Sequence, residues 1–298
     1  MSSTTRRDLL GGLSAAALGL GLPSLAQEGE EQAEGLAPEP NDSAAPSAKR
    51  ANWGMVIDLD LCTGCSACVV SCRSENNIPL NGRADEARGC EIDWMSLLPL
   101  KNGGSSAADS AGAEGEHADP SEFIPIPCMH CDNPACIKVC PVNATYLNDE
   151  GLVAQIWDRC IGCRYCMTAC PYSRRSFNWK HPEWAEEHRN LINPDVATRP
   201  DGVVEKCTFC YHRIRTAKEK ARLDGREVQD SELQQLPACA SVCPPRAITF
   251  GDLNDPESEV AHLAASPRAR RLLEHLGTKP KVVYLSRDRR EAPRSKAR

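Results

Sequence analysis

The sequence predicts an α+β, loop-rich fold built from two related cysteine-rich modules. Sixteen of the seventeen cysteines fall into four groups of four along the chain. Two segments of these groups recur further along, which indicates an internal duplication. Short stretches of alternating apolar and polar residues precede two of the groups, as half-buried strands would. Only 5% of residues are aromatic, so we expect metal held by the cysteines to supply part of the stability.

The four cysteine groups are called motifs 1 to 4 here. Motifs 1 and 3 share the spacing C-x2-C-x2-C-x3-C, motif 2 is C-x2-C-x4-C-x3-C, and motif 4 joins C-x2-C to C-x3-C across a gap of 28 residues. In chain order the motifs are Cys62, Cys65, Cys68 and Cys72; Cys128, Cys131, Cys136 and Cys140; Cys160, Cys163, Cys166 and Cys170; and Cys207, Cys210, Cys239 and Cys243.

Two repeats connect the motifs. The segment Asp60–Cys65 (Asp-Leu-Cys-Thr-Gly-Cys) recurs as Asp158–Cys163 (Asp-Arg-Cys-Ile-Gly-Cys). The segment Pro134–Pro141, with Pro-Ala-Cys at its start and Val-Cys-Pro at its end, recurs as Pro237–Pro244. The chain therefore contains a duplicated two-motif unit.

The spacing is typical of iron–sulfur clusters. Three cysteines at intervals of three lie on a loop that curls around one cluster, with backbone N–H groups turned toward the sulfurs. Gly64 and Gly162 give this loop conformational freedom. In a C-x2-C-x2-C-x3-C-P run the fourth cysteine binds the other cluster of a pair. We therefore expect four 4Fe–4S clusters, arranged in pairs.

Other uses of the cysteines fit less well. Structural zinc prefers two C-x2-C pairs or mixed Cys/His sites, and does not explain two uninterrupted four-cysteine runs. Disulfides between so many neighbours three residues apart would be strained and redundant. No Cys-x-x-Cys is followed by His, so covalent c-type haem has no attachment site. Cys90 lies outside every motif and is interpreted as a spare thiol.

Short secondary-structure elements are expected around the motifs. Strands are predicted over 55–59, over 153–157 and over 247–250, and a hairpin over 144–155. The insert 211–236 begins as a basic helix that breaks near Gly225. Four aromatic residues could lie near clusters, but as core residues they need no such role; they are Trp94, Trp157, Tyr165 and Trp179.

Residues 1–26 have the pattern of a twin-arginine export signal. Arg6 and Arg7 precede an apolar run over 11–22, and Ser-Leu-Ala follows before Gln27. Export in the folded state suits a protein whose clusters are assembled in the reducing cytoplasm. We expect the mature protein on the periplasmic side. No later stretch approaches the roughly twenty apolar residues of a membrane span.

The remaining boundaries follow composition. Residues 27–52 are predicted to be a disordered acidic Ala/Pro linker, and 101–121 a surface loop within the cysteine-bearing domain at 53–285. Residues 286–298 form a basic C-terminal tail. The wider stretch 268–298 carries eleven Lys or Arg against three acidic residues; we expect it to be solvated, with docking to anionic lipid or an acidic partner as the alternative. The net charge of −6, with no basic aromatic stripe, disfavours nucleic acid.

Three segments carry a family resemblance. They are the Cys-Met-His-Cys of motif 2, the Val-Glu-Lys-Cys-Thr-Phe-Cys at 204–210, and the Gly-Asp-Leu-Asn-Asp-Pro at 251–256. With the motif order they resemble the iron–sulfur subunit of the dimethyl sulfoxide reductase family. Its relatives serve polysulfide, tetrathionate and formate-dependent nitrite reductase systems and alternative complex III. The resemblance covers 53–285 and implies tandem ferredoxin-like dicluster modules. Cysteine stands at each ligand position, so nothing indicates a three-iron variant.

The resemblance also implies which motifs share clusters, whereas spacing gives only the exchanged fourth cysteine. Carried over by motif, it implies four ligand sets. Set 1 is Cys62, Cys65, Cys68 and Cys243; set 2 is Cys207, Cys210, Cys239 and Cys72; set 3 is Cys128, Cys131, Cys136 and Cys170; and set 4 is Cys160, Cys163, Cys166 and Cys140.

The function implied by the resemblance is electron transfer without catalysis in this chain. Such a subunit connects a molybdopterin-type catalytic subunit with a polytopic, quinone-reactive membrane subunit. His130 could tune a potential, contact a partner's cofactor, or simply pack or face solvent. The alternatives are a free periplasmic polyferredoxin and a zinc-stabilised interaction module. The same motifs serve several chemistries, so they select no terminal substrate.

Overall fold

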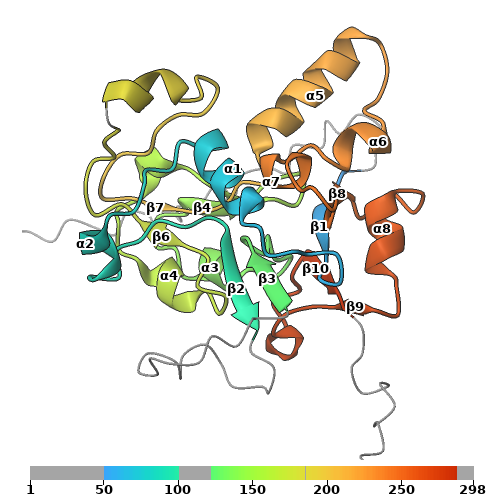
Figure 1. The fold of residues 1–298 in the computed structure, drawn as a ribbon, viewed down its shortest axis with the longest axis horizontal. Coiled ribbons are helices and arrows are strands. Elements are labelled where there is room, and N and C mark those ends of the chain that lie inside the picture. The colour runs from blue at the N-terminus through green and yellow to red at the C-terminus, as the bar shows by residue number, and fades with distance from the viewer. Residues whose placement is uncertain (1–49, 101–121, 185, 287–298) are drawn as a thin grey trace, which may run out of the picture. The chain divides into compact units, whose positions relative to one another are not determined.

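The structure is a computed structural model that describes residues 50–100, 122–184 and 186–286. Within these residues a four-stranded sheet joins the first strand to the last, in the order β8-β1-β10-β9 (Figure 1). Strand β1 (Trp53–Asp58) pairs in parallel with β10 (Val282–Leu285) and antiparallel with β8 (Ile248–Asp252); β9 (Ala269–Arg270) pairs with β10. Every residue of β10 is buried, which is usual for a strand inside a sheet.

Three two-stranded antiparallel sheets surround the remaining motifs. They are β2 (Ser96–Leu100) with β3 (Glu122–Ile126), β4 (Thr145–Leu147) with β5 (Val153–Gln155), and β6 (Ser176–Phe177) with β7 (Val204–Glu205). The pair β4–β5 confirms the predicted hairpin, with Gly151 at φ +72° in its turn. Leu100 pairs with Glu122, so β2 and β3 flank the predicted loop 101–121, which lies outside the described residues.

Most helices are short, and several of them begin inside a cysteine motif. In chain order they are α1 (Ala67–Glu75), α2 (Arg83–Glu86), α3 (Ala135–Lys138), α4 (Tyr165–Ala169), α5 (Tyr211–Leu223), α6 (Asp230–Leu233), α7 (Ala238–Ser241) and α8 (Glu259–Ala264), with 3-10 turns at Trp157–Arg159, Glu186–Leu191 and Glu274–Leu276. Helix α5 confirms the predicted basic helix, and Gly225, at φ +70°, follows its end. Helix α1 packs against α7, and α3 against α4.

The backbone repeats where the sequence repeats. Gly64 and Gly162 adopt φ of +70° and +67°, and Ser66 and Arg164 each adopt φ 61° immediately before helices α1 and α4. A Cβ atom at Gly64 would lie 2.3 Å from the Phe123 ring, and one at Gly162 would lie 2.3 Å from a backbone carbonyl oxygen. Glycine is required at both positions by the positive φ and by this close approach.

Several boundaries differ from the prediction. The strand predicted over 153–157 stops at Gln155, and the one over 247–250 runs instead over Ile248–Asp252. Most of the predicted linker 27–52 lies outside the described residues, as does the predicted export signal at 1–26. At its end, however, the Asn52 backbone N–H donates to the Asp252 carboxylate at 2.7 Å, so ordered structure begins before Trp53.

The first part of the basic stretch, residues 268–285, is not a solvated tail. Arg268 forms ion pairs with Asp58 and Asp60 at 2.8 and 2.5 Å. Lys281 is 2% exposed and donates to the Asn52 side-chain oxygen at 3.0 Å. The prediction was wrong there because the strands β9 and β10 interrupt the charges and attach them to the sheet. Residues 287–298 lie outside the described residues.

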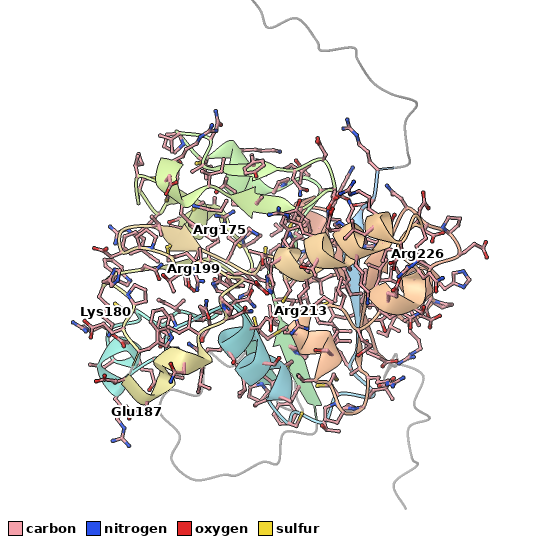
Figure 2. All side chains as sticks on the ribbon, turned by 90° about the horizontal axis from the view of Figure 1, so that it is seen from above. Arg175, Lys180, Glu187, Arg199, Arg213 and Arg226 are labelled. Atoms are coloured by element: carbon pink, nitrogen blue, oxygen red, sulfur yellow. The ribbon has the colours of Figure 1, made fainter. Side chains whose placement is uncertain are left out.

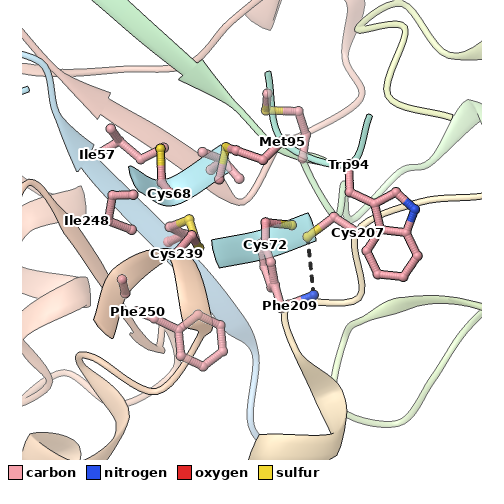
Figure 3. Close-up of a cluster of buried hydrophobic side chains, with 14 of the residues drawn as sticks. Ile57, Cys68, Cys72, Trp94, Met95, Cys207, Phe209, Cys239, Ile248 and Phe250 are labelled. Atoms are coloured by element: carbon pink, nitrogen blue, oxygen red, sulfur yellow. Dashed lines mark hydrogen bonds between the residues drawn. The ribbon is translucent and has the colours of Figure 1, made fainter. Parts of the chain in front are cut away.

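Motif cysteines form part of the main hydrophobic core. Cys68, Cys72, Cys207 and Cys239 are buried in one continuous core with Phe250 and other apolar side chains (Figure 3). Motif burial therefore couples the metal sites to the folding of the main sheet.

The aromatic residues expected in the core divide into two groups. Trp94 is 2% exposed and belongs to the core. Tyr165 and Trp179 are 59% and 51% exposed, so the expectation that they are core residues was wrong. Arg164 covers the Trp179 ring at 4.6 Å, which gives this exposed ring a partner at the surface. Among the described residues, no helix is long and apolar enough to cross a membrane.

Candidate metal centres

The structure brings together the cysteines of each ligand set that the resemblance implies. Two sets line cavities of about 340 and 280 Å³, counting the space at their mouths. The larger cavity is lined by Cys62, Cys65, Cys68 and Cys243, and the smaller by Cys140, Cys160, Cys163 and Cys166. These are sets 1 and 4.

The other two sets are recognised from the charges that act on their thiols. Burial raises the pKa of Cys72 well above its usual value, and its neighbours in set 2 raise it further; they are Cys207, Cys210 and Cys239. Burial also raises the pKa of Cys131 to about 12, assisted by its neighbours in set 3, which are Cys128, Cys136 and Cys170. Each set thus collects thiols from two different motifs.

Short helices explain how one motif serves two sets. Cys68 lies in the first turn of α1 and faces set 1, and Cys72 lies one turn later and faces set 2. Four residues of helix advance about 6 Å, which separates the two sulfurs along the axis. Helix α4 does the same for sets 4 and 3, with Cys166 in its first turn and Cys170 directly after its end. The exchanged fourth cysteine is therefore a consequence of helix geometry.

The donors fit a cluster of several irons. The backbone N–H of Phe209 donates to Cys207 Sγ at 3.4 Å (Figure 3), and that of Ala247 donates to Cys243 Sγ at 3.3 Å. Such N–H···S bonds are characteristic of iron–sulfur sites. Within the described ranges, no three His, Cys, Asp or Glu side chains converge on the position of a single ion. A cubane needs no such convergence, because its four thiolates bind different irons.

The thiols are poorly suited to carry charge without metal. Burial raises the pKa of Cys68 to about 11 and that of Cys207 to about 12, in each case with help from neighbouring thiolates. Metal binds thiolates, so the iron must offset this cost of desolvation. Cys140 is different, because the N–H groups of Thr145, Val142 and Ala144 outweigh its burial and lower its pKa.

His130 is a packing residue at the boundary between motifs 2 and 4. Its ring is fully buried and stacks on the Phe209 ring, with 3.9 Å between centroids. Its Nδ1 accepts from the Val153 N–H at 3.2 Å, so Nε2 carries the hydrogen and donates to the Cys207 carbonyl at 3.0 Å. Burial, followed by the charges of Lys206 and Lys281, lowers its pKa well below the usual value. A solvent-facing role and contact with a partner's cofactor are therefore ruled out.

Sequence reasoning missed three buried polar residues next to the thiols. Arg175 is 5% exposed and donates to Cys136 Sγ at 3.1 Å. Lys206 is 3% exposed and donates to the Cys207 carbonyl at 2.8 Å. The Asn76 amide lies 3.8 and 3.7 Å from the sulfurs of Cys72 and Cys210. Each follows or precedes a motif cysteine by at most five positions, which is the signal that could have indicated them.

Cys90 is half-buried and belongs to no set. Its Sγ donates to the Arg88 carbonyl oxygen at 3.6 Å. This placement agrees with the interpretation of a spare thiol.

The fold and the thiol sets define a ferredoxin-type iron–sulfur protein. Two family models described as "4Fe-4S dicluster domain" match residues 61–144 and 120–187. The chain is 48% identical over 240 residues to the iron–sulfur cluster-binding subunit of menaquinone reductase from Nitratidesulfovibrio vulgaris, covering 79% of this chain and 89% of that one. It is 34% identical to the B subunit of the polysulfide reductase from Wolinella succinogenes, covering 80% of this protein and 95% of that one.

The similarity extends to further respiratory reductases. The chain is 33% identical to the iron–sulfur subunit of the arsenate respiratory reductase from Shewanella sp., covering 78% of this chain and 95% of that one. The chain therefore belongs to the family of iron–sulfur subunits of the dimethyl sulfoxide, polysulfide, tetrathionate and menaquinone reductases. It is an electron-transfer subunit with 4Fe–4S clusters, and not the catalytic subunit of such a complex.

Proposed function

We propose that this chain relays single electrons through four 4Fe–4S clusters between a quinone-reactive membrane subunit and a molybdopterin-type oxidoreductase subunit. The observation that carries the proposal is the gathering of sixteen motif cysteines into four sets of four, each drawn from two motifs. A 4Fe–4S cluster supplies reversible one-electron storage without a change of ligands. The chain supplies the thiolates, the N–H···S bonds and the exclusion of water that set each potential.

The proposed ligands are those of the four sets. Cluster 1 is held by Cys62, Cys65, Cys68 and Cys243; cluster 2 by Cys207, Cys210, Cys239 and Cys72; cluster 3 by Cys128, Cys131, Cys136 and Cys170; and cluster 4 by Cys160, Cys163, Cys166 and Cys140. Clusters 1 and 2 form the first pair, and clusters 3 and 4 the second.

The contacts between the two pairs support a continuous route. After burial, the largest influence on the Cys207 thiol is the charge of Cys128, so sets 2 and 3 are adjacent. The stacked rings of His130 and Phe209 fill the space beside them and keep water out. An electron that passes from one pair to the other would cross at this contact.

The surface exposure of the thiols supports exchange with partners at both ends. Among the described cysteines, Cys65 of set 1 and Cys163 of set 4 are the exposed ones. A cluster close to the surface shortens the distance to a partner's cofactor. We assign one partner to each of these ends.

The proposed location is the periplasmic side of the membrane, reached by the twin-arginine route. The support is the pattern of Arg6 and Arg7 before an apolar run and Ser-Leu-Ala. The mature chain would then be held at the membrane peripherally, through its partners. Replacement of both arginines by lysine should leave the protein in the cytoplasmic fraction, and unchanged export would refute the assignment.

The experiment that tests the proposed function is anaerobic purification of the tagged chain from its native membranes. Four clusters of four irons predict sixteen irons and an equal amount of acid-labile sulfide per chain. Mass spectrometry should find a molybdopterin-family subunit and a polytopic membrane protein in the same complex. Zinc without sulfide would refute the proposal, and recovery of the chain alone in the soluble periplasm would favour the free polyferredoxin instead.

A further inference from the structure

A buried arginine lies between the two thiol sets of the second pair. Arg175 is 5% exposed, and its Nη2 donates to Cys136 Sγ of set 3 at 3.1 Å. The same guanidinium acts on Cys166 and Cys140 of set 4, where its charge favours the thiolate. In Figure 2 it lies in the green-to-yellow part of the ribbon that carries motifs 2 and 3, away from Arg226 on the far side. One side chain therefore contacts both members of a pair.

The surroundings of Arg175 hold it without neutralising it. Its Nη1 donates to Thr145 Oγ1 at 3.1 Å and to Gln155 Oε1 at 2.9 Å, both on the β4–β5 hairpin. The Thr145 hydroxyl donates to the same Gln155 oxygen at 2.8 Å, which fixes the orientation of the amide. Within the described residues, none of the hydrogen-bond acceptors of Arg175 is a carboxylate. Burial disfavours its cationic form, and the charges of Cys136, Cys166 and Cys128 outweigh that effect and raise its pKa.

Two other buried or half-buried arginines, Arg199 and Arg213, differ in this respect. Arg199 is paired with Glu205 at 2.5 Å, with both side chains 1% exposed. Arg213 is paired with Glu75 at 2.6 Å. Each of these cations forms a nearly neutral unit with its carboxylate, so its field is weak beyond the pair. The unpaired charge of Arg175 acts at full strength on the nearby sulfurs.

The first pair has a neutral donor where the second has this cation. Asn76 comes four residues after Cys72 of motif 1, and Arg175 comes five after Cys170 of motif 3. The Asn76 amide lies within 3.8 Å of the sulfurs of Cys72 and Cys210, and carries no charge. The duplicated modules thus use the same stretch of chain for different electrostatic purposes.

Reduction adds one negative charge to a cluster and its thiolates, and a fixed cation nearby stabilises that reduced form. We propose that Arg175 is a positioning and tuning residue that raises the reduction potentials of clusters 3 and 4 together. This inference rests on the proposed ligand sets. It makes the second pair a better electron store than it would be without this cation.

The test compares wild-type protein with Arg175→Gln, both as the full chain in the complex in which it co-purifies. Redox titration followed by low-temperature electron paramagnetic resonance gives the midpoint potential of each cluster. In R175Q we expect the reduced-to-oxidised ratio of two clusters to fall about tenfold at a fixed potential, which is about 59 mV for a one-electron couple. The other two clusters should keep their potentials. Arg175→Lys, which retains the charge, should recover most of the loss.

The neighbouring Arg174 provides a matched control. Its guanidinium donates to oxygens of Tyr172, Ser96 and Ile126, and the thiolates that act on it, Cys170 and Cys128, both belong to set 3. Arg174→Gln should therefore move one cluster, whereas R175Q moves two. Equal shifts of two clusters in both variants would overturn the special role of Arg175.

The remaining outcomes are also decisive. Unchanged potentials in an R175Q protein with full iron content overturn the inference. If R175Q loses iron, Gln155→Glu carries the test, because the new carboxylate neutralises Arg175 at almost constant side-chain volume. That variant should lower the same two potentials, and unchanged values would refute the role. Wild-type protein with fewer than four clusters would instead refute the proposed function, which keeps the two failures distinct.

Discussion

The two thiol pairs have the same ligand geometry and different surroundings. The first pair is built on the four-stranded sheet, and its thiols share a core with Ile57 and Phe250. The second pair is built on α3, α4 and the small hairpins. Duplication has preserved what the iron requires, namely cysteine spacing, positive-φ loop residues and short helices. Positions a few residues beyond the cysteines have diverged, and those positions set the charge around each pair.

The largest expected effect comes from the exchanged cysteines. Cys72→Ser should remove the cluster anchored by Cys207 and leave the one held by the first three cysteines of motif 1, because the Cys72 thiol lies with set 2. Iron content should fall by about one cluster, and the paramagnetic signal of one cluster should disappear or change. Cys170→Ser should do the same for cluster 3.

Cys90→Ser is the control for both substitutions, since Cys90 lies outside all four sets. It should leave iron content and every signal unchanged. An altered cluster at motif 1 in the Cys72→Ser protein would show that the pairing of motifs 1 and 4 is wrong.

The next effect concerns Arg199, which holds the backbone around Asn76, the neutral donor of the first pair. Arg199 donates to the backbone carbonyls of Asn76 and Asn77 at 2.6 and 2.9 Å, and its ion pair with Glu205 is almost completely buried. Arg199→Gln leaves Glu205 as an unpaired buried charge, which costs about 3–5 kcal/mol of unfolding free energy. Thermal unfolding of the purified complex would measure the loss.

The surface pair formed by Arg226 and Glu232 is the matched control, at 2.7 Å and open to solvent. Arg226→Gln should not change thermal unfolding measurably, because water and salt screen such a pair. A similar loss in both variants would show that burial does not decide the contribution of the Arg199 pair.

A smaller effect separates the two equivalent glycines. In Gly162→Ala the new Cβ would lie 2.3 Å from the Gly202 carbonyl oxygen at φ +67°, and backbone cannot move aside easily. In Gly64→Ala it would meet the Phe123 ring, which can turn. We expect G162A to cost about 1–3 kcal/mol and G64A to cost less, although both share the strain of a positive φ. Equal losses of thermal stability in the two variants would contradict this reasoning.

The sequence predicted the parts of the molecule that the ligand chemistry controls. The four motifs, the hairpin at 144–155 and the basic helix from Tyr211 follow from local spacing and turn residues, and the structure contains them. Pairing of β1 with β10 was not predictable in this way, because it joins residues more than two hundred positions apart and has no turn between them. Arg175 and Lys206 were missed for a related reason. Their burial depends on segments distant in sequence, and an arginine or lysine is usually exposed.

The smallest expected effect sharpens the comparison between the pairs. Asn76→Leu keeps the side-chain volume and removes the amide donor that lies within 3.8 Å of the sulfurs of Cys72 and Cys210. The potential of cluster 2 should fall by less than the roughly 59 mV expected for R175Q. The reason is that a neutral dipole stabilises added negative charge less than a cation does. The same redox titration measures this potential. The control is Asn133→Leu, which removes an exposed amide that donates to the Gly277 carbonyl at 2.9 Å. A fall as large as that of R175Q would mean that hydrogen bonds to sulfur, rather than net charge, distinguish the two pairs.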